Sequence, residues 1–361
     1  MSFYPSPYVL RTPYSSGVAP QRNCCLPPVV SQARQQITHY FGDKGGGLHC
    51  SPTYQNEPVP IQIRINNQAI PSVSLHDDDP IPSAVYQNIH KISEFYRRMF
   101  GYPLKSSRPD GIFVANVHKG TCEANVYWDS QRQEICVGDG DSYFQRLPYS
   151  LDIMGHALTD GALDDVLPDD GQPGAVKEHL SDVVGLLAEF LDENNRTPLD
   201  EDWVIGKNVI DGHFPLRSFV EPGQAFPPRL IYQRSVVCED LQARSYQARH
   251  HNPDFDQGGI HLNSGILNRA FYLFWKNSHL SPYRGGAPWE TTGWIWFTAF
   301  AKIKNGARCE SMLDFANLTL ASVYDLNPQN RADPELRKVY YYLLNAWRTV
   351  GFLEGLYPFL G

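Results

Sequence analysis

Two neighbouring stretches near the middle of the chain carry apolar residues at helical spacing. The first has them at positions 151, 154, 158 and 162, directly after Ser150, a residue type that commonly caps a helix. The second, residues 174–190, has them at 176, 180, 183, 184 and 187. An acidic segment with proline and glycine joins the stretches, so the pattern predicts two helices connected by a loop.

Strand patterns precede these helices, and further helical patterns follow them. Apolar and polar residues alternate over 59–65, and strands are also predicted at 111–118, 125–128 and 134–137. Helices are predicted at 84–100, 265–276, 290–304, 311–324 and 334–351. The fold class is therefore α+β, with an N-terminal extension over 1–57, a β-rich lobe over 58–166 and a mainly helical lobe over 167–361.

The composition argues against two classes of partner. At 361 residues and 42% hydrophobic, the chain can bury a large core, but no apolar run reaches the roughly 18–20 residues of a membrane helix. The net charge of −8 argues against nucleic acid. The N-terminus lacks the pattern of a signal peptide, and the seven cysteines include no C-x-x-C pair. We therefore expect a cytoplasmic protein with reduced thiols and no membrane contact.

The N-terminal part differs in charge from the rest of the chain. Residues 1–74 hold five basic side chains against two acidic ones, a net charge of +3, which leaves −11 for the remainder. This part also carries aromatic residues between Tyr4 and Tyr14, more than a solvated tail usually has. We expect the segment to pack on the body of the protein, with a disordered tail as the alternative.

Three side chains of the central helices are spaced like metal ligands. His156 and Asp160 lie four residues apart and project from one helix face, and Glu178 lies on the second helix. Gluzincin peptidases present zinc in this way, through the motif H-E-x-x-H. Here the motif would read His156-Ala157-Leu158-Thr159-Asp160, with alanine in place of the general base and aspartate in place of the second histidine. The alternative is a His/Asp pair on a solvated helix face.

Around these residues, the chain from about 80 to 353 resembles the thermolysin family of zinc metallopeptidases, most closely its protealysin-like branch. The matching segments include Val117-His118, Asn125-Val126-Tyr127-Trp128-Asp129, Gly138-Asp139-Gly140-Asp141, Gly155-His156, Ser181-Asp182, Leu216-Arg217-Ser218, residues 256–266, Trp289-Glu290 and residues 346–351. The resemblance implies a two-lobed fold in which a central active-site helix joins a β-rich N-terminal lobe to a helical C-terminal lobe. Ser6-Pro7-Tyr8-Val9-Leu10 looks like the pro-segment motif of this branch, which implies an N-terminal segment docked at the cleft.

The resemblance assigns catalytic and substrate-binding roles to five residues. His261 would donate a hydrogen bond to the developing oxyanion, Asp256 would orient the His261 ring, and Arg217 would hold a substrate carbonyl. Asn125 and Val126 would bind extended peptide along an edge strand. The implied partner is a peptide-like or small-molecule ligand, or a protein.

The same resemblance makes His156, Asp160 and Glu178 the metal ligands, with Asp182 behind His156. One nitrogen and two carboxylates select zinc less strongly than two imidazoles and one carboxylate do. We therefore expect either no metal or a weakly held divalent ion. In the metal-free case, Asp160 would pair with His156.

A calcium site of the family is matched by Asp152, Glu189 and Asp202. Two further ligand positions of the family are Val204 and Lys207 in this chain. A lysine there would place an ammonium group where a cation would otherwise bind. We therefore expect one calcium ion at most.

Three functions are compatible with these features. The first is a catalytically lapsed thermolysin-like protein that still binds a ligand, because loss of a positioned general base costs roughly 10²–10⁴ in rate. The second is an enzyme of another class that reuses His261, Asp256 and Arg217, with His156 and Asp160 as acid and base. The third is a zinc metalloendopeptidase that carries inactivating substitutions. We rank the first highest and the second close to it.

Overall fold

The computed structural model describes residues 59–358, apart from gaps at 66, 70–78, 102–103, 105, 107, 120–123, 142–143, 193–196, 208, 212, 226–229, 233–234, 239 and 279–289. The N-terminal extension, with its basic and aromatic residues, lies outside the described residues. The docking of that segment therefore stays a prediction.

The β-rich lobe contains a five-stranded sheet in the order β2-β1-β3-β5-β4. Its strands are β1 (Ile61–Ile65), β2 (Gln68–Ala69), β3 (Phe113–Val117), β4 (Val126–Asp129) and β5 (Glu134–Val137). Strand β3 runs parallel to β1 and β5, whereas β4 pairs antiparallel with β5 and forms one edge of the sheet. The four predicted strands are confirmed, with ends that differ from the predicted ones by at most two residues.

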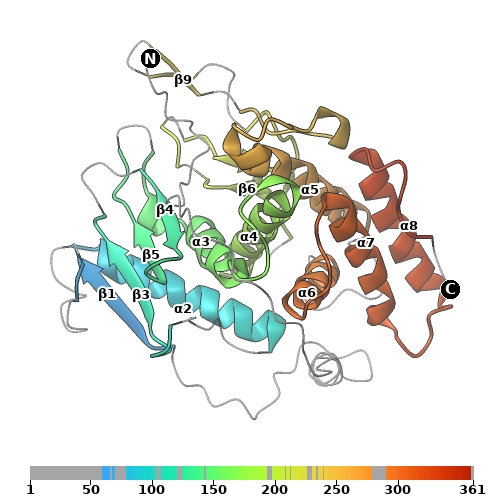
Figure 1. Cartoon of the computed structure of the whole chain (residues 1–361), viewed down its shortest axis with the longest axis horizontal. Coiled ribbons are helices and arrows are strands. Elements are labelled where there is room, and N and C mark those ends of the chain that lie inside the picture. Colours follow the sequence, from blue (N-terminus) through green and yellow to red (C-terminus); the bar gives the residue numbers. More distant parts are fainter. Residues whose placement is uncertain are drawn as a thin grey trace.

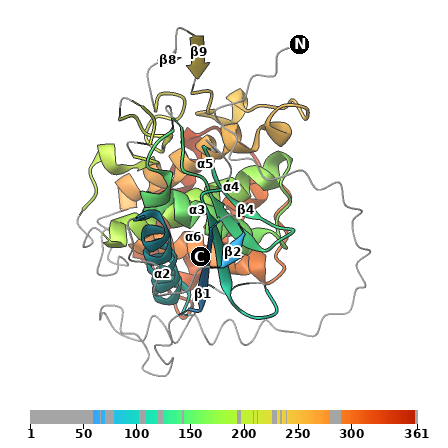
Figure 2. The same ribbon diagram turned by 90° about the vertical axis from the view of Figure 1, so that its left-hand side faces the viewer.

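Helix α2 (Ile81–Phe100) packs on β1 and β3 along one face of this sheet (Figure 2). It begins three residues before the predicted start at 84. Pro82 is tolerated in the first turn, and the Asp79 carboxylate accepts a hydrogen bond from the Ile81 N–H at 3.0 Å. The helix ends at Gly101, whose left-handed φ of 77° is typical of a helix C-terminus.

After the central helices, the described part of the helical lobe contains α5 (Asp256–Ser278), α6 (Glu290–Lys304), α7 (Met312–Ser322) and α8 (Pro334–Thr349). The predicted helices are confirmed, but α5 begins well before the predicted start at 265. Gly258 and Gly259, with φ of 86° and 85°, interrupt the apolar pattern there. Short pairs of strands precede these helices: β6 (Val204–Ile205) with β7 (Arg217–Ser218), and β8 (Leu230–Tyr232) with β9 (Ser235–Cys238). Among the described helices, none is long and apolar enough to cross a membrane.

Helices α3 (Leu151–Leu163) and α4 (Gly171–Asp192) form the centre of the molecule. Figure 1 shows the sheet on one side of them and the helices of the C-terminal lobe on the other. Their close approach depends on two glycines. A Cβ atom at Gly155 would lie 2.9 Å from the Gly185 Cα, and a Cβ atom at Gly185 would lie 2.2 Å from the backbone oxygen of Asp152. Both glycines therefore fix how α3 and α4 cross.

Substitution of Gly185 by alanine is expected to lower the free energy of unfolding by about 3 kcal/mol, because a methyl group there overlaps the backbone of α3. The higher helix propensity of alanine recovers at most about 1 kcal/mol. Chemical denaturation monitored by circular dichroism measures the change. Asp192→Ala on the same helix is the control, since Asp192 makes an exposed ion pair with Lys91. Equal stability of the Gly185→Ala and wild-type proteins would show that the crossing can relax.

Candidate active site

Helices α3 and α4 bring His156, Glu178 and Asp182 together. Glu178 and Asp182 lie four residues apart on α4 and therefore face the same side. The His156 Nε2 atom lies 3.4 Å from the Glu178 Oε2 atom, and its Nδ1 atom lies 2.8 Å from the Asp182 Oδ1 atom. All three side chains are buried. His156 is thus held between two carboxylates, one at each ring nitrogen.

Arg217, on β7, contacts the same aspartate. Its Nη2 atom lies 2.5 Å from the Asp182 Oδ1 atom, and both side chains are buried. The side-chain amide of Asn268 on α5 donates to the Asp182 Oδ2 atom at 2.8 Å. Burial alone would raise the pKa of Asp182, but Arg217 and the hydrogen bonds from His156 and Asn268 lower it. Asp182 is therefore an ionised acceptor for three donors.

His261 and Asp256 meet at the start of α5. The His261 Nδ1 atom lies 2.5 Å from the Asp256 Oδ1 atom, while the Asp256 Oδ2 atom accepts the backbone N–H groups of His261 and Leu262 at 3.0 and 3.1 Å. The other ring nitrogen, Nε2, lies 3.5 Å from the Glu178 Oε2 atom. Asp256 therefore fixes the orientation of the ring, and Glu178 lies between the two imidazoles of the site.

Burial alone would lower the pKa of His156, but the charges of Glu178 and Asp182 raise it to about 9. The same imidazoles hold the pKa of Glu178 below its usual range although burial opposes this. The pKa of His261 is also raised, because Glu178 and Asp256 outweigh its burial. With a pKa of about 9, the His156 imidazole carries a proton near neutral pH.

The charge of His156 predicts a pH dependence of stability. A group whose pKa is higher in the folded chain stabilises the fold fully below its unfolded pKa of about 6.5, and this contribution disappears as the pH rises through about 9. Stability should therefore fall by up to about 3 kcal/mol across this range. Denaturation curves measure this fall, and His156→Gln should remove most of it. NMR of the ring nitrogens provides a direct check, since a neutral His156 ring at pH 7 would contradict the prediction.

A chain of hydrogen bonds behind Asp182 was missed by the sequence analysis. The indole N–H of Trp296 on α6 donates to the His179 Nε2 atom at 2.6 Å. The His179 Nδ1 atom therefore carries the hydrogen and donates to the Asn268 Oδ1 atom, also at 2.6 Å. Burial lowers the pKa of His179 to about 4, which keeps the ring neutral. The Asn268 amide is thereby oriented with its NH₂ group toward Asp182.

Asp160 contacts a lysine that the sequence analysis did not single out. The Lys177 Nζ atom lies 3.1 Å from the Asp160 Oδ1 atom, 3.3 Å from the Asp164 Oδ1 atom and 2.5 Å from the Asp169 Oδ1 atom. Lys177 is only 1% exposed. Asp160 thus forms an ion pair with Lys177, whereas the sequence analysis expected it to pair with His156 in the metal-free case. The available signal was a lysine beside apolar Val176 in the second predicted helix, next to a loop rich in aspartate.

The residues present do not fit a three-ligand zinc site. Within the described residues, one group of three potential ligands brings its ligand atoms within 4.8 Å of one another, and that group does not include His156, Asp160 or Glu178. A catalytic zinc site needs three protein ligands around the metal. At position 157, where the resemblance places the general base, the methyl group of Ala157 is buried in the hydrophobic core.

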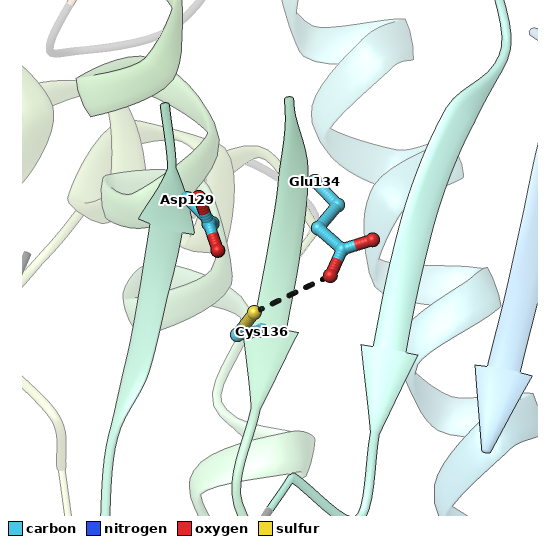
Figure 3. Close-up of side chains that lie close together, drawn as sticks. All are labelled: Asp129, Glu134 and Cys136. Atoms are coloured by element: carbon cyan, nitrogen blue, oxygen red, sulfur yellow. Dashed lines mark hydrogen bonds between the residues drawn. The ribbon is translucent and has the colours of Figure 1, made fainter. Parts of the chain in front are cut away.

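The group of three that does cluster is Asp129, Glu134 and Cys136, on β4 and β5 (Figure 3). Asp129 already pairs with Arg132 at 2.7 Å, and Glu134 pairs with Arg64 at 3.3 Å. Burial raises the pKa of the Cys136 thiol to about 11. Ion pairs with Arg132 and Arg64 already engage both carboxylates of this cluster.

The remaining predicted residues lie at the edge of the sheet and beside α4. Asn125 directly precedes β4, and Val126 is its first residue; both are buried. Asp152 accepts the backbone N–H groups of Ile153 and Gly206 at 2.8 and 2.6 Å. The Lys207 Nζ atom lies 3.2 Å from the Asp202 Oδ1 atom, in a small pocket that is also lined by Glu189, Phe190 and Val204. The roles predicted for these residues in peptide and calcium binding stay predictions.

The fold and the constellation of His156, Glu178, Asp182, Arg217 and His261 define the class of two-lobed thermolysin-like metallopeptidases. Residues 79–164 match the thermolysin metallopeptidase catalytic domain, and residues 167–351 match the thermolysin metallopeptidase alpha-helical domain. The chain belongs to the thermolysin metallopeptidase family, and its structure confirms the similarity to protealysin.

Three similar proteins illustrate this membership. The solved precursor of protealysin, a metalloproteinase from Serratia proteamaculans, has a TM-score of 0.67 and 25% identity, covering 90% of this chain and 98% of that chain. Protease PrtS of Photorhabdus sp. (strain Az29) is 30% identical over 301 residues, which is 79% of this chain and 74% of the relative. An extracellular metalloprotease of Pectobacterium carotovorum subsp. carotovorum is 30% identical over 311 residues, 81% of this chain and 82% of the relative.

The expectation of a cytoplasmic protein is wrong. It relied on the missing signal-peptide pattern, and a missing pattern does not determine the compartment. A relative that matches most of the chain is named an extracellular metalloprotease.

Proposed function

We propose that this chain is a catalytically lapsed thermolysin-like metallopeptidase homologue that still binds a peptide-like or small ligand. The observation that carries the proposal is Ala157, a buried methyl group at the position of the general base, one residue after His156. No proton acceptor on that side chain can activate a water molecule. Loss of a positioned base lowers the rate by roughly 10²–10⁴.

Ligand binding is supported by the polar groups that remain at the site. His261 is oriented by Asp256 at 2.5 Å, as a hydrogen-bond donor to a ligand oxygen requires. The Arg217 Nε atom and the Asn125 Oδ1 atom are buried without a hydrogen-bond partner in the described structure. A peptide backbone supplies both acceptors and donors, and similar proteins are named proteases, so peptides are the ligand class that fits best.

An enzyme of another class is the second candidate. The close contact between His261 and Asp256 favours it, because an oriented imidazole can serve as acid or base. The pair of His156 and Asp160 does not support it, since Asp160 contacts Lys177.

The test combines a turnover assay with a binding assay on the full chain. Casein and a furylacryloyl dipeptide are offered with zinc or with a chelator, and binding of the dipeptide is measured by calorimetry. We expect no chelator-sensitive turnover, together with binding that His261→Ala weakens and the exposed control Arg308→Met leaves unchanged. Chelator-sensitive hydrolysis at ordinary peptidase rates would refute the lapse, and absence of dipeptide binding would refute the retained site. Turnover that a chelator does not affect and His261→Ala abolishes would favour the second candidate.

A further inference from the structure

A buried lysine lies at the centre of an acidic cluster, formed by Asp160, Asp164 and Asp169, next to the candidate active site. Lys177 precedes Glu178 on α4 and is 1% exposed, whereas the side chains of its partners Asp160, Asp164 and Asp169 are 10%, 22% and 37% exposed. Lys177 is thus the least exposed charged side chain of the cluster, and its three carboxylate partners are more exposed to solvent. Asp160 belongs to α3, and Asp164 and Asp169 belong to the segment between α3 and α4.

This arrangement is costly unless it is complete. An ammonium group taken out of water needs opposite charges and hydrogen-bond acceptors. The Lys177 Nζ atom donates to Asp164 at 3.3 Å and to Asp169 at 2.5 Å, and it forms an ion pair with Asp160 at 3.1 Å. Without the lysine, buried Asp160 would lose this ion pair and would face the carboxylates of Asp164 and Asp169. These four residues therefore depend on one another, and Lys177 is a fixed part of the cluster.

The same geometry acts on the neighbouring site. The His156 Nε2 atom lies 3.4 Å from the Glu178 Oε2 atom. The resemblance places the third metal ligand at Asp160, but the Asp160 carboxylate is paired with Lys177. A side-chain cation therefore competes with any metal ion for that carboxylate. The lysine is part of the chain, so its effective concentration does not depend on the metal concentration in solution.

We propose that Lys177 is a built-in cation that neutralises the carboxylates of Asp160, Asp164 and Asp169 and excludes Asp160 from metal binding. The chain thereby stabilises the region between α3 and α4 without a bound metal ion. This inference concerns the acidic cluster around Lys177 alone and does not depend on whether the candidate active site binds peptide.

The first measurement is thermal unfolding of the full chain and three variants. Lys177→Met should lower the Tm by about 5 °C or more, because it leaves buried carboxylates without their cation. Lys177→Met/Asp160→Asn should recover part of that loss, since it removes the most buried of these charges. Lys338→Met is the control, because Lys338 also pairs with a carboxylate, that of Glu335, but the two side chains are 59% and 41% exposed, and its Tm should change little. A Tm of Lys177→Met equal to that of the wild type would overturn the proposal.

The second measurement is zinc binding by the wild type and Asp160→Asn, using zinc alone as the probe in calorimetry and elemental analysis. We expect neither protein to hold one zinc ion per chain. One tightly bound zinc ion in the wild type, with an affinity that Asp160→Asn lowers tenfold or more, would show that Asp160 is a ligand and would overturn the proposal. This comparison does not use Lys177→Met, so it decides the question even if that variant fails to fold.

Discussion

Replacement of Arg217 by methionine is expected to lower the free energy of unfolding by about 3 kcal/mol or more. Arg217 and Asp182 are both buried, and removal of one partner of a buried ion pair leaves the other charge uncompensated. Asp182 would keep its hydrogen bonds from His156 and Asn268, which places the loss at the lower end of the usual range. Urea denaturation monitored by tryptophan fluorescence measures the change.

Arg308→Met is the control for this substitution. Arg308 also pairs with a carboxylate, that of Glu310, but both side chains are largely exposed, at 76% and 66%. Its replacement should leave the denaturation midpoint unchanged. If Arg217→Met were as stable as Arg308→Met, the pair of Arg217 and Asp182 would contribute nothing net, and the support behind His156 would have another origin.

Restoring the general base alone, with Ala157→Glu, is expected to leave peptidase activity at the background level. Under the proposed lapse, the missing base is only one of two defects, because Asp160 is paired with Lys177 and would not complete a metal site. A general base in this family removes a proton from a water molecule whose pKa a metal ion has lowered, so without the metal the base has no such water to deprotonate. Hydrolysis of a furylacryloyl dipeptide, with zinc supplied and a chelator as control, measures the activity.

Further variants separate the two defects. Ala157→Glu/Asp160→His restores the motif but leaves the Lys177 ammonium beside the new imidazole, so we expect little activity. Adding Lys177→Asn removes that cation and should raise chelator-sensitive turnover by roughly 10²-fold or more over Ala157→Glu alone. Full recovery by Ala157→Glu alone would show that Asp160 is an adequate metal ligand.

The fold could be predicted from the sequence where periodicity was strong. The alternation over 59–65 and the helical spacing over 290–304 appear in the structure as β1 and α6. The starts of α2 and α5 were missed because local chemistry sets them. Pro82 occupies the first turn of α2, and Gly258 and Gly259 break the apolar pattern before α5 continues. Hydrophobic periodicity carries no information about such termini.

The sequence predicted the site less completely than the fold. It identified His156, Glu178 and His261. In the structure, the Glu178 Oε2 atom lies 3.4 Å from the His156 Nε2 atom and 3.5 Å from the His261 Nε2 atom. Spacing on a single helix placed Asp160 on the face of His156, but the partner of Asp160 comes from another helix. An ion pair between helices depends on how they cross, and here that crossing is set by Gly155 and Gly185. Sequence spacing cannot supply that information.

The chain of hydrogen bonds from Trp296 through His179 and Asn268 to Asp182 makes the site repairable. This chain anchors Asp182, and hence His156, in the helical lobe without using position 157 or 160. Substitutions at those two positions therefore leave the scaffold of the site in place. An engineer who wishes to install a new activity could vary 157, and could vary 160 together with its partner Lys177, on a support that the rest of the molecule maintains.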